Sequence, residues 1–374
     1  MKITMGQSPN SINYTNNPDD YILVQGNADM KNGFVHPRVW TTQITKTAEI
    51  GDIILSVRAP VGDVAKTDYD IVLGRGVAGI KGNQFIFQLL KKYKEDGYWK
   101  KISTGSTFES INSNIIKEAK LLLPSAKEQN YLGDFFNEMD QTITLLQRKI
   151  NNLNKVKKGL LQKLFPTGQS INPRIRFNGF NQDWEQHELG KNSEIAAGGT
   201  PKTTELSYWN PEEIPWMSSG EINNRRINRT EKMISQLGYK RSSATWIPKK
   251  SVLIALAGQG KTRGMVAVNE IPLTTNQSIA AIIPKEKLYY EFIYQNLLSR
   301  YEELRLISSG DGSRGGLNKQ IISSIFISSP SIKEQQIIGD FFKNIDDTIT
   351  LLQKEVEVKK QIKKGFLQKL FPKE

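Results

Sequence analysis

A run of amide and guanidinium side chains from Asn223 to Arg229 offers the densest recognition chemistry in the sequence. Asn and Arg can form paired hydrogen bonds with adenine and guanine edges in the major groove of DNA. The same composition also suits a solvated surface loop, so both interpretations stay open. Other cations lie in or beside turns, from which they could reach phosphates or base edges. The full set of candidate DNA-binding residues is Arg38, Arg58, Arg75, Lys101, Lys202, Arg225, Arg226, Arg229, Lys240, Arg241, Lys261, Arg263 and Arg314.

Two glycine-rich segments suggest phosphate contacts. Residues 258–262 resemble part of a nucleotide-binding loop, but Ala255 stands where that pattern requires Gly. A hairpin loop that brings Lys261 and Arg263 to DNA fits better, and an ordinary solvated turn is the alternative. The segment 74–76, Gly-Arg-Gly, would let a backbone approach a phosphate closely, or it could mark a bulged strand.

The sequence contains no convincing catalytic set. Residues 210–213, Asn-Pro-Glu-Glu, lack the second Pro and the aromatic residue of an adenine methyltransferase loop. Residues 185–188, Glu-Gln-His-Glu, lack the paired histidines of a zinc helix, and no nuclease pattern of Asp followed by Glu-x-Lys is present. We therefore predict a chain that is not an enzyme and has no catalytic residue, metal ligand or cofactor of its own.

Composition narrows the class of partner. The net charge of +13 favours a polyanion such as nucleic acid, although solubility alone could also account for it. Cys is absent and only two His occur, which excludes disulfides and thiolate sites. No apolar run approaches the roughly 20 residues of a membrane helix, and the N-terminus has no apolar signal core. We expect a soluble, cytoplasmic protein without membrane contact.

The strongest signal is an internal repeat. Residues 124–166 align without a gap to residues 330–372, with 25 identities in 43 positions. A period of this length indicates a duplicated domain rather than a solenoid. Fainter matches lie upstream, where 6–9 resembles 198–201 and 51–57 resembles 250–256. The helices have diverged little and the domains greatly, which suggests a fixed scaffold holding two readers of different targets.

Each strong repeat predicts a long helix with one apolar stripe. Apolar residues recur every three or four positions over about four heptads, which is the pattern of a coiled coil. Two such helices joined through a large domain would most easily lie antiparallel. A surface helix packed on its own domain is the weaker alternative. The stripe residues are Phe136, Met139, Ile143, Leu146, Ile150, Leu153, Phe342, Ile345, Ile349, Leu352 and Val356.

The segments between the helices predict β-rich domains with some helix. Buried strands are expected at 52–57 and 251–256, each followed by a glycine-containing turn. The fold class is therefore α+β: two mixed β-rich domains joined by two long antiparallel coiled-coil helices, related by a pseudo-two-fold repeat. The expected boundaries are a first domain at 1–123, a first helix region at 124–166, a linker at 167–192, a second domain at 193–326 and a second helix region at 327–374.

The chain resembles the specificity subunit of type I restriction–modification systems over nearly its whole length. The duplicated helix carries the most specific part of the resemblance, and several motifs of the globular domains add to it. These are Pro-x-x-Lys-Glu-Gln at Pro124 and Pro330, the duplicated Gly-Asp-Phe-Phe and Leu-Gln-Lys-Leu-Phe-Pro blocks, Gly-Gly-Thr-Pro at 198–201, Tyr-Trp at 208–209, Ile-Pro-Trp at 214–216, and the segments 25–29 and 56–62.

The resemblance implies that each globular domain is a target-recognition domain that reads one half of a bipartite double-stranded DNA site. It implies that the coiled coil sets the spacer and docks two modification subunits. Those subunits would bring S-adenosylmethionine and methylate adenine. Whether restriction subunits with ATP-dependent endonuclease activity also join is left open, as are the target sequence and the spacer length.

Two other classes stay open beside this hypothesis: a coiled-coil scaffold without nucleic-acid contact, and a nucleic-acid-acting enzyme with an unrecognised site. The first domain starts at the equivalent of about Ser193, so we expect roughly 20 residues at the entry to the second domain to have no counterpart in the first. This departure from the family pattern bears on how the first domain packs.

Overall fold

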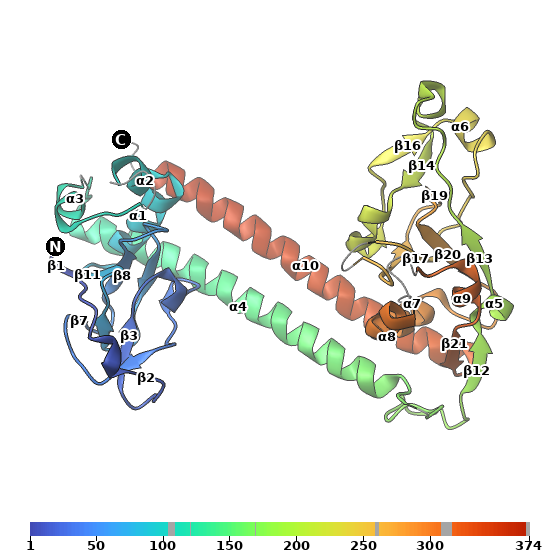
Figure 1. The fold of residues 1–374 in the computed structure, drawn as a ribbon, viewed down its shortest axis with the longest axis horizontal. Helices are drawn as coiled ribbons and strands as arrows, with labels where there is room; N and C mark the ends of the chain where they lie inside the picture. The colour runs from blue at the N-terminus through green and yellow to red at the C-terminus, as the bar shows by residue number, and fades with distance from the viewer. Residues whose placement is uncertain (104–108, 120, 169, 259–261, 308–315, 372–374) are drawn as a thin grey trace. The chain divides into compact units, whose positions relative to one another are not determined.

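The computed structural model describes residues 1–103, 109–119, 121–168, 170–258, 262–307 and 316–371. The chain forms two compact units. Unit 1 comprises Met1–Gln147 with Lys354–Glu374, and unit 2 comprises Arg148–Gln353. Each unit holds one β-rich domain and a part of each of two long helices, α4 and α10 (Figure 1).

Unit 1 contains two sheets with the strand orders β1-β11-β8-β9-β5-β4 and β2-β6-β3-β10-β7. Its helices are α1 (Gln84–Glu95), α2 (Tyr98–Ile102) and α3 (Ser113–Glu118). Its strands are β1 (Ile3–Met5), β2 (Tyr14–Thr15), β3 (Tyr21–Val24), β4 (Met30–Lys31), β5 (Phe34–Val35), β6 (Trp40–Thr41), β7 (Thr47–Ala48), β8 (Ile53–Ser56), β9 (Val64–Lys66), β10 (Ile71–Leu73) and β11 (Val77–Ile80).

Strand β8 shows why this sequence forms a buried central strand. Its four residues are all buried, and successive side chains point to opposite faces of the sheet. Ile53 and Leu55 join the core on the side of α1, whereas Ile54 joins the core between the two sheets. A continuous apolar run is therefore what a strand covered on both faces requires.

Unit 2 repeats this arrangement with the strand orders β13-β20-β17-β18-β15 and β16-β14-β19. A further two-stranded sheet pairs β12 (Glu185–Glu188) with β21 (Phe326–Ser329). Its helices are α5 (Leu189–Asn192), α6 (Gln236–Lys240), α7 (Tyr290–Ser299), α8 (Tyr301–Ile307) and α9 (Lys319–Ser323). Its remaining strands are β13 (Ser193–Ala197), β14 (Ile214–Met217), β15 (Arg226–Ile227), β16 (Lys232–Ile234), β17 (Val252–Ala255), β18 (Val266–Asn269), β19 (Thr274–Thr275) and β20 (Ile279–Pro284).

The two domains share a common core of strands. The order β1-β11-β8-β9-β5 matches β13-β20-β17-β18-β15, and the parallel pair β3–β10 matches β14–β19. Equivalent backbone bonds hold the segment after the first strand: Gly6 N donates to Val77 O, and Gly198 N donates to Ile279 O. The faint upstream repeat in the sequence therefore reflects a shared fold.

The two strong repeats form α4 (Ala126–Leu164) and α10 (Ile332–Leu370), each of 39 residues. Within unit 1, Phe136 contacts Phe371 and Asp140 contacts Lys363, so the partner number falls as the α4 number rises. The helix segments of unit 1 are therefore antiparallel. The contact between Lys157 and Asp346 and that between Phe165 and Phe342, at the end of α4, give the same direction in unit 2.

The predicted α+β arrangement, with antiparallel helices and a pseudo-two-fold repeat, is confirmed. Every residue of the expected apolar stripe is buried or half-buried in its helix. Short helices α1 and α7 approach the long helices closely at two glycines. A Cβ at Gly133 would lie 2.9 Å from Phe85 N, and one at Gly339 would lie 3.0 Å from Glu291 Cβ, so each position leaves no room for a side chain.

None of the helices formed by the described residues has the length and apolarity that crossing a bilayer requires.

Candidate nucleic-acid interface

In unit 1, two arginines lie at one end of the β8–β11 ladder. Val77 pairs with Ser56, and Val57 N continues the ladder by donating to Gly76 O at 2.9 Å. Arg58 follows this ladder and forms an isolated bridge with Ser110, whereas Arg75 lies in the turn that precedes β11; both arginines are exposed. Two exposed cations at the same end of a ladder attract anions such as phosphates. The charge of these two arginines and the donor geometry of a guanidinium therefore suit a phosphate or a guanine edge.

The backbone beneath these arginines is fixed by short polar side chains. Ser56 Oγ donates to the carbonyl oxygens of Arg58 and Pro60, at 3.0 and 2.8 Å. Ser8 Oγ accepts a hydrogen bond from Arg75 N at 3.1 Å. The turns are held while the two guanidinium groups stay exposed, so binding would not have to order this backbone first.

The glycines beside Arg75 have a structural explanation. A Cβ at Gly76 would lie 2.0 Å from Gln25 O, and one at Gly74 would lie 3.0 Å from Gln25 Cα. Close packing of the turn on Gln25 therefore requires both glycines. This requirement is enough to explain the Gly-Arg-Gly sequence without a bound phosphate.

The equivalent edge of unit 2 has the same backbone and different side chains. Thr200 stands where Ser8 stands, and its Oγ bonds to the side chain of Gln277, which occupies the position of Arg75. Ala257 occupies the position of Arg58. Lys202, two residues after Thr200, is exposed. The β17–β18 connection joins two antiparallel strands, as the hairpin interpretation predicted. Lys261 in that connection lies outside the described residues.

The arginines near Asn223 separate into two groups. Arg225 and Arg229 are exposed. Arg226 instead turns inward: its guanidinium makes two hydrogen bonds to the carboxylate of Glu291 and lies 4.8 Å from the ring centre of Tyr294. Burial alone would lower the pKa of Arg226, but the hydrogen bonds and charge of Glu291 raise it above its ordinary value. The Arg226 side chain is therefore bound inside unit 2, although the sequence analysis predicted Arg225, Arg226 and Arg229 equally as DNA-binding residues.

The other candidate cations lie at scattered positions. Arg38 is exposed and donates to Ala28 O at 3.1 Å. Arg263 is half-buried, and Arg314 lies outside the described residues. The remaining candidates, all exposed, are Lys101, Lys240 and Arg241.

The sequence interpretation missed a pair of buried charges between the long helices. In unit 1, Lys363 Nζ lies 2.6 Å from Asp140 Oδ1, and Gln88 also donates to Asp140. Burial and the neighbouring Lys91 lower the pKa of Lys363 to about 8. Burial would raise the pKa of Asp140, but Lys91 and Lys363 hold it below its ordinary value.

Unit 2 contains the same arrangement. Lys157 Nζ lies 2.6 and 2.7 Å from the two oxygens of Asp346, and Gln295 also donates to that carboxylate. Burial lowers the pKa of Lys157, and the charge of Asp346 opposes that change. The signal available in the sequence was that Asp and Lys stand at equivalent positions of both repeats. Among the described residues, no group of three or more His, Asp or Glu could hold a metal ion.

Comparison with known proteins identifies the family. The sequence model for the type I restriction modification DNA specificity domain matches residues 1–155 and 181–363. The chain belongs to this family. The family predicted from the repeat motifs is therefore confirmed.

Individual relatives agree. A putative type I restriction enzyme MjaX specificity subunit from Methanocaldococcus jannaschii is 31% identical over 169 residues, covering 44% of this chain and 39% of that protein. The MjaIX specificity subunit from the same organism is 31% identical over 186 residues, covering 48% and 42%. These alignments span only about two-fifths of the curated relatives' own length. The crystal structure of a type I restriction–modification S subunit from M. genitalium has the same fold, with a TM-score of 0.71, 17% identity, and coverage of 100% of this chain and 94% of that one.

Proposed function

We propose that the chain is the sequence-specific DNA-binding subunit of a type I restriction–modification complex. Each β-rich domain reads one half of a bipartite, double-stranded site. The observation that carries this proposal is the equivalent sheet edge in the two domains. The backbone is held alike in both, whereas Arg58 and Arg75 in unit 1 are replaced by Ala257 and Gln277 in unit 2. A shared frame with different exposed side chains suits two readers of different half-sequences.

Charge supplies the part of affinity that does not depend on sequence. The net charge of +13 favours contacts with phosphates and release of their counterions. Each domain can then bind modestly alone, because joining two readers in one chain raises the effective concentration of the second at its half-site.

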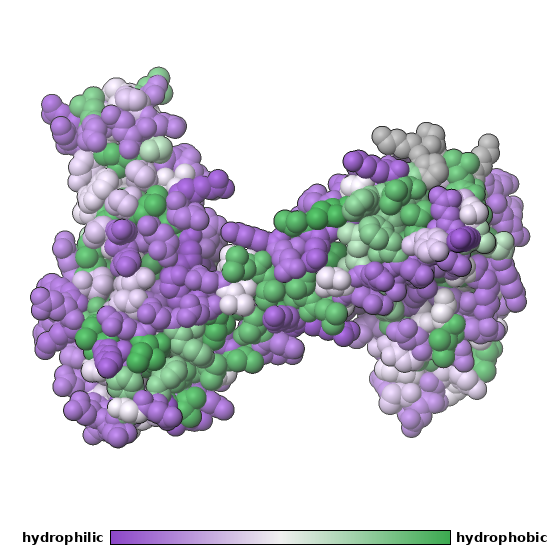
Figure 2. Space-filling view, turned by 180° about the vertical axis from the view of Figure 1, so that it is seen from behind, coloured by the Kyte–Doolittle hydropathy of each residue, from purple (hydrophilic) through white to green (hydrophobic). Residues whose placement is uncertain are grey.

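We further propose that two copies of one partner, the modification subunit, dock on the long helices. The helices expose large apolar side chains at positions that are equivalent in the two repeats, once in each unit. Hydrophobic surface is visible along the helices (Figure 2). The equivalent exposed pairs are Tyr131 and Ile337, Leu145 and Leu351, and Val156 and Ile362. Exposed apolar faces of this kind are typical of interaction surfaces, and a duplicated face fits two identical partners.

In this proposal the chain contributes recognition and assembly and catalyses no reaction. The modification subunits supply S-adenosylmethionine and the residues that methylate adenine, and the proposal leaves open whether restriction subunits with ATP-dependent endonuclease activity also join. The coiled coil sets the unspecified spacer, because the recognition domains are joined through it.

Methylome sequencing tests the proposal. The chain is expressed with a type I modification subunit that co-purifies with it, in cells whose DNA is otherwise unmethylated. We expect one bipartite adenine motif, absent when the chain is omitted. In an Arg58→Ala, Arg75→Ala variant, one half of the motif should relax while the other half is unchanged. Glu138→Ala, at an exposed helix position, serves as the matched control and should leave both halves intact. The proposal would be contradicted by a methylated motif that persists when the chain is omitted. It would also be contradicted if the arginine variant lost sequence preference in both halves of the motif.

A further inference from the structure

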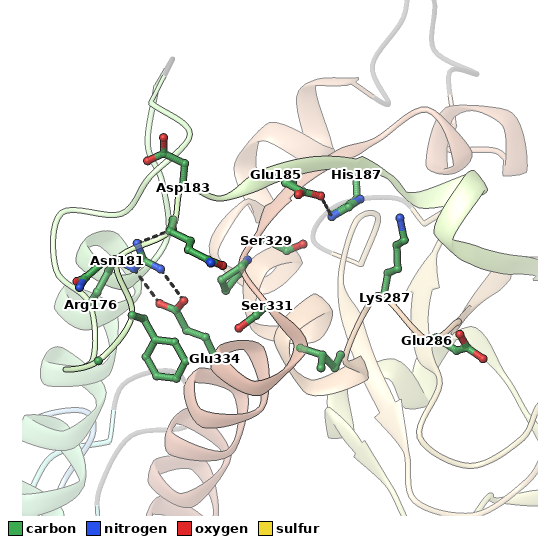
Figure 3. A pocket seen from close by; sticks show the side chains of 15 residues that line it. Arg176, Asn181, Asp183, Glu185, His187, Glu286, Lys287, Ser329, Ser331 and Glu334 are labelled. Carbon is green, nitrogen blue, oxygen red and sulfur yellow. Dashed lines mark hydrogen bonds and ion pairs between the residues drawn. The ribbon is translucent and has the colours of Figure 1, made fainter.

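The pocket of unit 2 in Figure 3 lies between residues 176–187 and the start of α10. Its charged side chains engage one another: two hydrogen bonds join Arg176 to Glu334, and His187 lies 3.6 Å from Glu185. Carboxylates outnumber the Arg and Lys side chains on its walls, and an excess of carboxylates repels a phosphate backbone. A DNA contact of unit 2 is therefore expected elsewhere.

Two aliphatic side chains, one in each unit, are almost fully exposed at comparable places. Ile12 is 84% exposed and Leu206 is 80% exposed, and no other large apolar side chain among the described residues is as exposed. Each lies on a 3₁₀ helix, at Ser11–Asn13 in unit 1 and at Leu206–Tyr208 in unit 2. In each domain this helix is the next element after an outer strand, β1 or β13. A single exposed aliphatic residue is ordinary, but the same exposure at one place in two diverged domains indicates a shared use.

The backbone around Ile12 is held in unit 1 while its side chain stays exposed. Asn10 Oδ1 accepts a hydrogen bond from Ile12 N at 3.2 Å, and Gln43 Oε1 accepts one from Asn10 N at 2.8 Å. Four residues before Ile12, Ser8 Oγ accepts from Arg75 N at 3.1 Å. The turn that carries Ile12 is therefore tied to the end of the sheet that presents Arg75.

Different contacts hold the backbone around Leu206 in unit 2. Ser235 Oγ donates to Ser207 O at 2.6 Å, and Ser235 N donates to Tyr208 O at 2.9 Å. Helix α6 packs directly on this turn, because a Cβ at Gly238 would lie 2.2 Å from Tyr208 O. The two domains thus use different bonds for one result, an aliphatic side chain that a fixed backbone directs to solvent.

The segment that holds each turn adds a second aliphatic residue and a cation. In unit 1 these are Ile44, which is 52% exposed, and the exposed Lys46. In unit 2 they are Leu237, which is 46% exposed, and Lys240, which is exposed at the end of α6. An apolar tip with cations beside it suits a polyanion that has apolar surface between its charges. Stacked bases between two phosphate backbones are such a partner.

We propose that Ile12 and Leu206 are wedge residues, each of which inserts its side chain between two stacked base pairs of its half-site. Aliphatic wedges of this kind partly unstack a base step and kink the duplex. The inference rests on the proposed function, because it requires the DNA site that the two domains read. It goes further by assigning to each domain a residue that deforms the DNA.

Insertion adds specificity that hydrogen bonds to base edges do not supply. Burying an aliphatic side chain between bases offsets part of the cost of unstacking, and that cost depends on which step is opened. Pyrimidine–purine steps open more easily than other steps. Each half of the methylated motif should therefore contain a TA, CA or TG step at the position where its wedge residue enters.

The fluorescence of 2-aminopurine, which rises when this base unstacks, tests the proposal on the chain co-purified with a modification subunit. The probe replaces one purine at a time in a duplex that carries the methylated motif. The methylated adenine itself is left unchanged, because a methyltransferase flips its target base out of the stack. On binding we expect a severalfold rise at one step in each half-site. Leu206→Ala should abolish the rise in one half, and Ile12→Ala should abolish it in the other.

Affinity gives a second readout. Each alanine variant should weaken specific binding by on the order of tenfold, because the apolar burial is lost. Leu206→Met keeps an apolar tip of similar volume and should retain both the fluorescence rise and the affinity. Ile50→Ala is the matched control and should change neither readout, because Ile50 is 66% exposed but precedes β8, whereas Arg58 follows that strand. Circular dichroism checks that each variant is folded.

Three results would overturn the inference. One is sequence-specific binding with no fluorescence rise outside the target adenine, or with a rise that both alanine variants keep; the proposed function would then stand without wedges. Another is an affinity loss in Leu206→Ala that replacing thymine by uracil in the same half-site reproduces, since the side chain would then contact a thymine methyl group from outside the stack. The last is the absence of sequence preference for any duplex, which would overturn the proposed function as well.

Discussion

The buried ion pair between Asp140 and Lys363 gives the sharpest prediction about the helices. Removing the acid by Asp140→Asn leaves Lys363, which is 9% exposed, beside Lys91 without a carboxylate. Breaking a buried pair on one side costs about 3–5 kcal/mol, and since the Asp140 side chain is 29% exposed we expect about 2–4 kcal/mol. Lys363→Met should cost less, because Asp140 keeps its contacts with Lys91 at 3.3 Å and Gln88 at 2.9 Å.

The loss caused by Asp140→Asn should also depend on pH. The pKa of Lys363 is about 8, below its unfolded value, and removing Asp140 lowers it further. A buried lysine of this kind weakens folding while the lysine is charged, and stability recovers as pH rises from the folded pKa toward the unfolded pKa. The unfolding free energy of the variant therefore begins to recover at a lower pH than that of the unmodified chain. The difference in unfolding free energy between the two should therefore narrow from pH 7 to pH 9.

Urea unfolding followed by tryptophan fluorescence measures this difference, because urea does not screen charge as guanidinium does. Hydrogen exchange should localise the loss to the helix segments of unit 1. The control is Asp347→Asn, which removes an exposed pair with Lys343 and should cost about 0.5 kcal/mol or less. A cost equal to that of the control, or a difference that stays constant from pH 7 to pH 9, would refute the reasoning.

Four further outcomes follow. Arg225→Ala with Arg229→Ala should relax the half-site not affected by Arg58→Ala with Arg75→Ala, each lost bidentate base contact costing about 1–3 kcal/mol in competition binding. Arg226→Ala should lower the unfolding free energy by about 3 kcal/mol, because it leaves the buried Glu291 without its cation. Urea unfolding followed by circular dichroism measures this loss. DNA affinity of the assembled complex should fall linearly on a log–log salt plot, with a slope of about −0.9 for each phosphate neutralised. A matched four-residue insertion in the middle of α4 and α10 lengthens each by about 6 Å and should change the motif's spacer by about one or two base pairs while both half-sequences persist in the methylome.

Local patterns in the sequence were sufficient to predict the helices, their direction and the duplicated domains. Stripe residues such as Phe136 and Phe342 recur at helical spacing, and a run such as Ile53–Leu55 is buried on both faces of a sheet. Periodicity reports burial along one element directly. The hairpin between β17 and β18 was predicted for the same reason, because two apolar runs flank a segment that contains glycines.

The direction of a charged side chain was not predictable in this way. Arg225 and Arg226 are adjacent in sequence, yet only Arg226 meets Glu291, and that meeting depends on where α7 lies. Likewise, the sequence alone does not distinguish Asp140 and Lys363 from other polar residues of their helices. Their contact becomes evident only when the register of the two helices is known. Propensity and spacing carry no information about which carboxylate a cation will find 65 or 223 residues away.

The position of these charges explains how recognition could change without loss of the fold. Lys157 with Asp346, and Lys363 with Asp140, form the same contact in both units, and Gln295 and Gln88 support it in the same way. Arg58 and Arg75 contribute none of these bonds, whereas in unit 2 Arg226 of the edge strand β15 lies 4.0 Å from Asp346. A substitution at an edge such as Arg75→Gln therefore alters what the domain presents while leaving the buried ion pairs intact. The converse holds in unit 1, where replacing Asp140 removes a contact between the helices and no bond that Arg58 or Arg75 makes, so the stability of this scaffold and the side chains at its sheet edge can vary independently.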